Sequence, residues 1–147
     1  MSDLTRFGVS VEDELLVSFD QLIGVQGYET RSEALRDLMR EALIKAKLEN
    51  FPESGEAIGS LTLVYDHHAS TMQQEMAGIQ HDFHELVLSV MHLHVSHDDC
   101  LEILAVRGTV ADIVKLSNAL LSLKGIKNGK LFLTLPSSSI ISPHQAL

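Results

Sequence analysis

Two histidines and the single cysteine of this chain have the types and spacing of metal ligands, in the pattern His92-x-His94-x5-Cys100. Alternate residues of a β-strand project to the same face, which would place His92 and His94 about 6.5–7 Å apart along one strand. A chain reversal over residues 95–99 would bring Cys100 beside them on the next strand. With a further nitrogen, this donor set suits Ni(II) or Cu(II) in a plane and Zn(II) in a tetrahedron. The spacing therefore predicts a metal site rather than isolated hydrogen-bonded histidines and a core cysteine.

The remaining ligand is not determined by spacing, although seven of the eight histidines lie within residues 67–97. Four of them are candidates: His67, His68, His81 and His84. His67 and His68 could instead hold a second, weaker metal, but we expect them to be simply exposed. Glu102 follows Cys100 by two residues and so shares its face. Its carboxylate would either orient a ligand from behind or be solvated.

The elements that must position these residues follow from the periodicity of apolar residues. The pattern predicts strands over residues 58–66, 86–96, 100–107 and 129–135, and helices over 69–82 and 109–123. This βαββαβ order is ferredoxin-like, with both helices on one face of the sheet. Since residues 86–95 are apolar on both faces, we expect another subunit to cover the open face. A histidine of that subunit could then complete the metal site.

The first part of the chain has a different pattern. Residues 6–11 alternate between apolar and other residues, with Phe7, Val9 and Val11 on one face. A helical pattern follows and ends at Gly27, and the capping-box form of residues 30–33 predicts a second helix. A lone strand cannot satisfy its own backbone groups, so we expect it to pair with the same strand of a second copy.

The break between the two parts contains Pro52, Gly55 and Gly59. The sequence therefore predicts an α+β protein with a first domain over residues 1–50 and a linker over 51–58. The second domain would occupy residues 59–136. Residues 137–147 are rich in serine and lack periodicity, so we expect a flexible tail.

Composition restricts the classes of function. The 147 residues carry a net charge of −9, which disfavours a broad basic surface for nucleic acid and requires any DNA contact to be local. No apolar run reaches the ~18 residues of a membrane span, and no secretory signal is visible. One cysteine fits a reducing cytoplasm. We expect no enzyme, because phosphate loops, HExxH and GxSxG are absent and four protein ligands would leave a metal no open position.

Five stretches match a known family: Gly27-Tyr28, Arg31-Ser32-Glu33-Ala34, Arg36-Asp37, Gln80-His81-Asp82 and, most specifically, the run from His92 to Ile103. Over about residues 5–136 the chain resembles the nickel-responsive transcriptional regulators, the NikR family. The resemblance implies a ribbon-helix-helix DNA-binding domain followed by an ACT-like domain, assembled as a homotetramer. It implies one Ni(II) per subunit, in a square-planar site made by His92, His94 and Cys100 with His81 of a neighbouring subunit. It also implies nickel-dependent binding to operator DNA, usually to repress nickel-uptake genes.

The DNA contacts are predicted in the first domain. A two-stranded ribbon can enter the major groove, where Arg6 and Ser10 would offer hydrogen-bond donors to base edges. Gly8 lies between them and has no side chain to read a base, which departs from the family's pattern. The start of the second helix would hold a phosphate. The residues there are Thr30, Arg31 and Ser32.

Several alternatives remain open at this point. Glu33 and Asp37 form a solvated helix face on the sequence pattern, whereas the resemblance implies a cation site between the two domains. The regulator could respond to Zn, Co or Cu instead of nickel, or its ACT-like domain could bind a small molecule such as an amino acid. A zinc-dependent hydrolase is the last alternative, and it would need an open coordination position.

Overall fold

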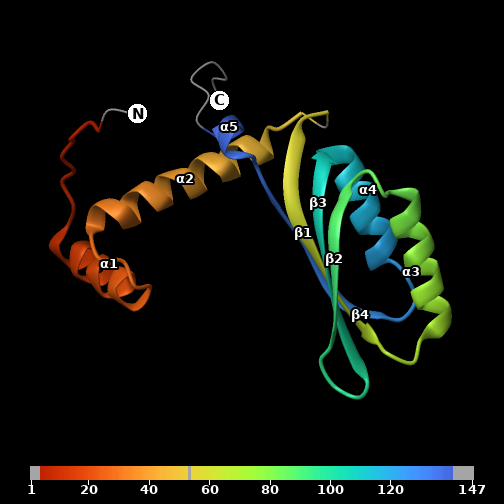
Figure 1. Ribbon diagram of the computed structural model, residues 1–147. Coiled ribbons are helices and arrows are strands. Elements are labelled where there is room, and N and C mark those ends of the chain that lie inside the picture. Colours follow the sequence, from red (N-terminus) through yellow and green to blue (C-terminus); the bar gives the residue numbers. More distant parts are fainter. Residues whose placement is uncertain (1–3, 53, 141–147) are drawn as a thin grey trace. The chain divides into compact units, whose positions relative to one another are not determined.

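The structure, a computed structural model, describes residues 4–52 and 54–140 (Figure 1). The chain divides into two compact units, the first ending at Leu43 and the second beginning at Ile44. This division falls within a helix and before residue 50, where the sequence pattern places the end of the first domain. In the described part of the chain, no helix is long and apolar enough to cross a membrane.

The first unit consists of helix α1 (Asp13–Val25) and most of helix α2 (Arg31–Glu49), which confirms both predicted helices. Gly27 has a φ of +84°, a conformation that lets the chain turn after α1. Thr30 caps α2, because its Oγ1 accepts a hydrogen bond from the backbone N–H of Glu33 at 3.2 Å. Among the described residues of this unit, only Ile23 and Ala34 are buried, so two helices alone do not enclose a core.

Residues 4–12 have no regular secondary structure in this single chain. The strand predicted over residues 6–11 is therefore not formed here. Phe7 and Val9 are each 63% exposed, and Val11 is 39% exposed. Since the predicted partner of this strand is a second copy of the chain, the paired ribbon stays a prediction.

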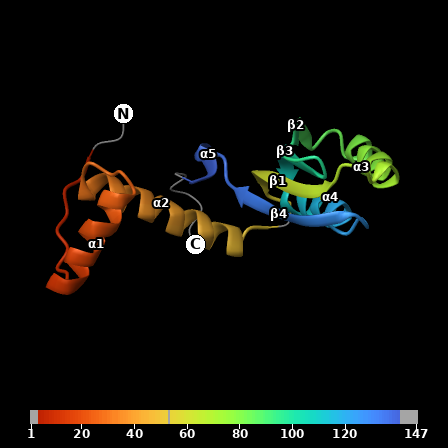
Figure 2. The same cartoon turned by 90° about the horizontal axis from the view of Figure 1, so that it is seen from below.

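The second unit has the predicted order of elements. Its strands are β1 (Glu56–Asp66), β2 (Val87–His94), β3 (Asp99–Thr109) and β4 (Ile126–Thr134). They form one antiparallel sheet in the order β2-β3-β1-β4. The labels in Figure 2 follow this order across the sheet. Helix α3 (Ser70–Asp82) joins β1 to β2, and helix α4 (Val110–Leu121) joins β3 to β4. This is the ferredoxin-like topology that the sequence pattern predicts.

Two details at the ends of this unit differ from the sequence-based expectations. Strand β1 begins at Glu56, inside the segment 51–58 that was expected to be a linker. A short helix α5 (Ser137–Ile140) forms where a flexible tail was expected. The rest of that expected tail, residues 141–147, lies outside the described residues.

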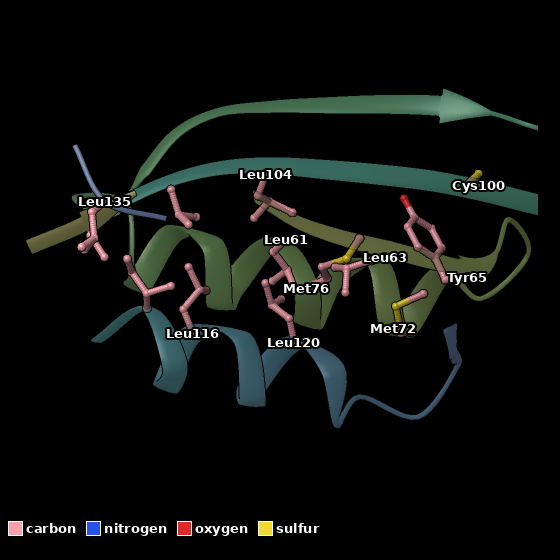
Figure 3. Packing of buried hydrophobic residues seen from close by; sticks show 13 residues of the cluster. Leu61, Leu63, Tyr65, Met72, Met76, Cys100, Leu104, Leu116, Leu120 and Leu135 are labelled. Carbon is pink, nitrogen blue, oxygen red and sulfur yellow. The ribbon is translucent and has the colours of Figure 1, made fainter. Parts of the chain in front are cut away.

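The core lies between one face of the sheet and helices α3 and α4 (Figures 1 and 3). Leu61 and Leu63 of β1 alternate with partly exposed neighbours, and Leu104 of β3 pairs with Leu61 on the same face. Leu116 and Leu120 of α4 pack against this layer. The alternation follows the pleat of a sheet that is covered on one side only.

The other face of the sheet is uncovered in the single chain. Met91 and Leu93 of β2 lie on this face and are 55% and 41% exposed. Phe132 of β4 lies there too and is 63% exposed. This is the open face that, on the sequence pattern, another subunit is expected to cover.

Candidate metal centre

The hairpin of β2 and β3 brings the predicted ligands to one face of the sheet. In its register, His94 is paired with Cys100 and His92 with Glu102. Strand β1 adds a third residue beside His94 and Cys100, because Tyr65 is paired with Cys100. Directly paired residues in an antiparallel sheet point to the same side, so all five side chains share one face.

That face is the one carrying the helices, which corrects the expectation that a subunit lying on the open face could complete the site. Cys100 has no exposed surface and belongs to the core cluster, near Tyr65 at one end of the core (Figure 3). His92 and His94 remain exposed because β2 is the edge strand of the sheet. A further ligand would therefore have to approach along the β2 edge of the helix-bearing face.

The sulfur of Cys100 has two imidazole nitrogens as close neighbours. His94 Nδ1 lies 3.5 Å and His67 Nδ1 3.3 Å from Cys100 Sγ. One ligand atom from each of these three residues lies within 4.8 Å of the other two, a spacing that a single ion could occupy. His67 reaches this position because the loop after β1 is tied to the turn before β3, where the His67 N–H donates to the Asp98 carbonyl at 2.9 Å. The sequence pattern had left His67 as one of four candidates.

His92 is positioned differently from His94. Its ring centroid is 5.0 Å from that of His94, but its Nδ1 lies 2.9 Å from the hydroxyl oxygen of Tyr65. That hydroxyl donates its one proton to Glu102 Oε2 at 3.0 Å, so His92 Nδ1–H must donate to the hydroxyl oxygen. The His92 Nε2 lone pair is then free to bind a metal.

Glu102 supports the contact between Tyr65 and His92 from the buried side. Its side chain is buried, so the alternative of a solvated carboxylate is wrong. One oxygen accepts from Tyr65, and the other accepts from the Nε2 amide group of Gln80 on α3. The sequence reasoning missed both Tyr65 and Gln80 as supporting residues. The position of Tyr65 on the buried side of β1 was the available signal, since a buried hydroxyl requires a partner.

The electrostatics at Cys100 favour the neutral thiol in the metal-free chain. Burial, and then the negative charges of Glu102, Asp99 and Asp66, raise the pKa of the Cys100 thiol. Burial and Glu102 also raise the pKa of Tyr65, which therefore keeps its proton as a donor. A metal ion that binds the sulfur must displace the thiol proton.

His81 does not join these donors within the single chain. It lies exposed in the last turn of α3, and its ring is stacked with that of His84 at a centroid distance of 6.1 Å. The prediction for His81 concerns a neighbouring subunit, so a single chain does not test it.

The residues predicted to bind DNA or a cation lie in the first unit. Arg6, Gly8 and Ser10 are exposed in the segment without regular structure. Arg31 makes a two-pronged ion pair with Asp20, at 2.7 and 2.6 Å. Thr30, Arg31 and Ser32 are all exposed, and Thr30 also caps α2.

Glu33 and Asp37 each have a partner inside the first unit. Glu33 Oε2 accepts from the Thr30 hydroxyl at 3.3 Å, and Asp37 accepts from the Tyr28 hydroxyl at 3.1 Å. Asp37 also pairs with Arg40. The cation site that the resemblance implies thus falls on one partly buried carboxylate, Glu33, and one exposed carboxylate, Asp37, in separate contacts.

Comparison with known proteins adds independent information. The family model described as “NikR C terminal nickel binding domain” matches residues 58–134. A protein of Solibacter usitatus named “Putative nickel-responsive regulator” is 50% identical over 134 residues, which cover 91% of this chain and 95% of that protein. Proteins of the same name from Syntrophus aciditrophicus and Chlorobaculum tepidum are 47% and 48% identical, over 89% and 87% of this chain and 93% of each relative. The similarity to these relatives therefore extends over both units.

Proposed function

Because this chain belongs to the family of nickel-responsive regulators, we propose that it binds operator DNA in response to Ni(II) and represses transcription of nickel-uptake genes. The family is one of regulators and not of enzymes, in agreement with the expectation from the sequence. The observation that carries the proposal is the gathering of imidazole and thiol donors around Cys100. Imidazole with one thiolate is a donor set that fits Ni(II).

The proposed nickel ligands are His92, His94 and Cys100, with His81 from a neighbouring subunit and one Ni(II) per subunit. Support comes from the β2 edge, where His92 and His94 are exposed and accessible to a second subunit. Bound nickel would hold two subunits together through these ligands. The chain's own contribution is to engage His92 Nδ1 through Tyr65 and Glu102, which leaves Nε2 free for the metal.

The proposed assembly is a homotetramer with two kinds of contact. The open face with Met91, Leu93 and Phe132 would be covered by another second unit, since exposed apolar side chains gather there. Phe7 and Val9 would be covered when residues 6–11 of two copies pair as a ribbon. That ribbon belongs to the proposed ribbon-helix-helix domain, and the sheet unit to the proposed ACT-like domain.

The proposed DNA contacts are those of the ribbon and the start of α2. Arg6 and Ser10 would face base edges on either side of Gly8, and the helix start would face a phosphate. The phosphate contacts would come from Thr30, Arg31 and Ser32. A cation near Glu33 and Asp37 would have to replace their present partners, which are Thr30 for Glu33 and Tyr28 and Arg40 for Asp37. Binding to operator DNA places the protein in the cytoplasm.

The test is a titration of metal-free protein with NiCl₂, followed by absorption. We expect one equivalent per chain with a sulfur-to-nickel charge-transfer band, and Cys100→Ala should abolish that band. Ser122→Ala is the matched control, since Ser122 is exposed and distant in sequence from the donors. If Cys100→Ala keeps the charge-transfer band, or if the wild type lacks it, Cys100 is not a nickel ligand.

DNA binding is tested separately with a random-sequence duplex pool, selected with and without NiCl₂. The selected duplexes should bind the wild type only with nickel, and Arg6→Ala should weaken that binding while the charge-transfer band stays intact. Nickel-independent selection of the same duplexes would refute the coupling of the two sites. A monomer in gel filtration, with and without nickel, would refute the proposed assembly.

A further inference from the structure

The short helix α5 lies against the end of α2. Helix α2 begins in the first unit and ends in the second, so its last residues, 44–49, belong to the sheet unit. Within that unit, Lys47 Nζ donates a hydrogen bond to the backbone carbonyl of Ser139 in α5 at 2.6 Å. Both residues are partly buried, and they are 92 positions apart in the sequence. A segment near the end of the described chain thus contacts α2 where this helix joins the sheet unit.

Both sides of this contact are anchored to the core of the second unit. Leu135 lies shortly before α5, is 3% exposed and belongs to the core cluster. Leu48 of α2 and Phe51, which follows this helix, pack against the same cluster. The Ser139 N–H donates to the Pro136 carbonyl at 2.8 Å, which closes the turn of α5. The hydrogen bond between α2 and α5 therefore joins two segments that are each fixed to the core.

The segment between α2 and β1 is held as well. The Phe51 ring lies against the backbone of Gly55, where any side chain would collide with it. The Gly55 carbonyl accepts from the N–H of Val110, the first residue of α4, at 3.1 Å. At the end of α2, the side-chain amide of Asn50 donates to the Ala46 carbonyl at 3.0 Å. A joint with these contacts resists bending more than an unstructured linker does.

We propose that α5 is a strap on the last turn of α2, and that it stiffens the joint through which metal binding in the second unit affects DNA binding in the first. The strap stands on the contacts above, whereas its role in transmission rests on the proposed function. A freely bending joint would let α2 adopt the same orientations whether or not the second unit holds a metal, so it would transmit nothing. A joint held by α5 restricts these orientations, and the state of the second unit can then bias the first.

The strap is built so that it can be released without unfolding the sheet unit. Helix α5 has four residues, and so short a helix is not stable by itself. Its docking therefore depends on the anchor at Leu135 and on the hydrogen bond from Lys47. That hydrogen bond is charge-assisted, because its donor is an ammonium group, and is stronger than a neutral one. Release of α5 would be a local opening at the joint.

The strap is tested by hydrogen exchange of the metal-free 147-residue chain, followed by mass spectrometry. Lys47→Met removes the ammonium group and keeps an unbranched side chain. It should speed exchange of the backbone amides of residues 44–50 by about tenfold, the size expected for the loss of one charge-assisted hydrogen bond. A chain that ends at Pro136 lacks α5 and should show the same increase. Exchange within the sheet should stay unchanged in both variants.

Two matched controls accompany these variants. Lys45→Met removes an exposed ammonium group from the same helix, and a chain that ends at Ile140 keeps α5. Both should exchange as the wild type does. Unchanged exchange of residues 44–50 in Lys47→Met and in the chain that ends at Pro136 overturns the strap. An equal increase in either control overturns it too, because the effect would then not depend on the contact between α2 and α5.

Transmission is tested with the selected duplexes, by comparing their dissociation constants with and without NiCl₂. The ratio of the two constants should fall by about three- to tenfold in Lys47→Met and in the chain that ends at Pro136, while the sulfur-to-nickel band keeps its wild-type amplitude. Faster exchange with an unchanged ratio overturns the transmission. A wild type that binds the duplexes equally well with and without nickel refutes the proposed function instead, and the exchange measurement still decides whether α5 holds α2.

Discussion

Binding of Ni(II) to the metal centre at neutral pH should release one proton from Cys100 for each ion bound. The sulfur can bind the metal only as thiolate, and the thiol is protonated beforehand. Burial is the main cause, since Cys100 has no exposed surface, and the negative charges of Glu102, Asp99 and Asp66 add to it. All of these raise the pKa of the thiol above its ordinary value.

The number of protons released follows from the raised pKa of the thiol. A cysteine with an ordinary pKa of about 8.5 is about 3% ionised at pH 7, and a raised pKa makes the fraction smaller. Nickel should therefore release close to one full proton from the thiol at pH 7. The apparent dissociation constant should fall about tenfold for each unit of pH between about 7 and 8, equivalent to about 1.4 kcal/mol per unit.

Calorimetry in buffers with different enthalpies of ionisation measures this proton directly. The observed heat, plotted against the ionisation enthalpy of the buffer, has a slope equal to the number of protons released. The slope for Cys100→Ala should be lower than that of the wild type by close to one proton. A wild-type slope that equals the slope of Cys100→Ala would show that the thiol is already ionised or does not bind nickel, and the reasoning from burial would be refuted.

Three further predictions concern stability and the support of the metal ligands. Tyr65→Phe removes a donor from buried Glu102 and the partner of His92, so urea denaturation should show a loss of about 1–3 kcal/mol, and nickel affinity should fall about 10–100-fold. Leu104→Ala opens a cavity in the core and should cost about 2–5 kcal/mol in the same assay; a loss well below that range would contradict the described packing. Hydrogen bonding to Arg31 lowers the pKa of Asp20, so the pair stabilises the fold above the ordinary carboxyl value of about 3.9, and this contribution disappears as the pH falls through the lowered value. In an acid titration followed by circular dichroism, Asp20→Asn should therefore lose less stability than the wild type, and an identical loss would show that the exposed pair contributes nothing.

The helices and strands of the second unit could be predicted because each depends on the periodicity of its own segment. The alternation of β1 placed Leu61 and Leu63 on the buried face, and the spacing of His92, His94 and Cys100 placed them on one hairpin. The family could be recognised from the run that contains these residues. The structural basis is local, since strand pleat and helix turn are set by neighbouring residues.

The segment at residues 6–11 shows where such prediction ends. Its alternation was read correctly as a strand pattern, but a strand forms only when another strand accepts its backbone hydrogen bonds. The single chain provides no such partner, and residues 4–12 have no regular structure in it.

The sequence by itself therefore determined the hairpin that carries His92, His94 and Cys100, the order of the elements and the family. Only the tertiary structure decided which additional side chains reach those donors. His67 lies beside Cys100, and Tyr65 beside His92, because the register of β1, β3 and β2 pairs residues that are far apart along the chain. Glu102 is buried because the face it shares with Cys100 is the one the helices cover. These contacts depend on strand order, register and layer packing, which are properties of the whole fold and not of any one segment.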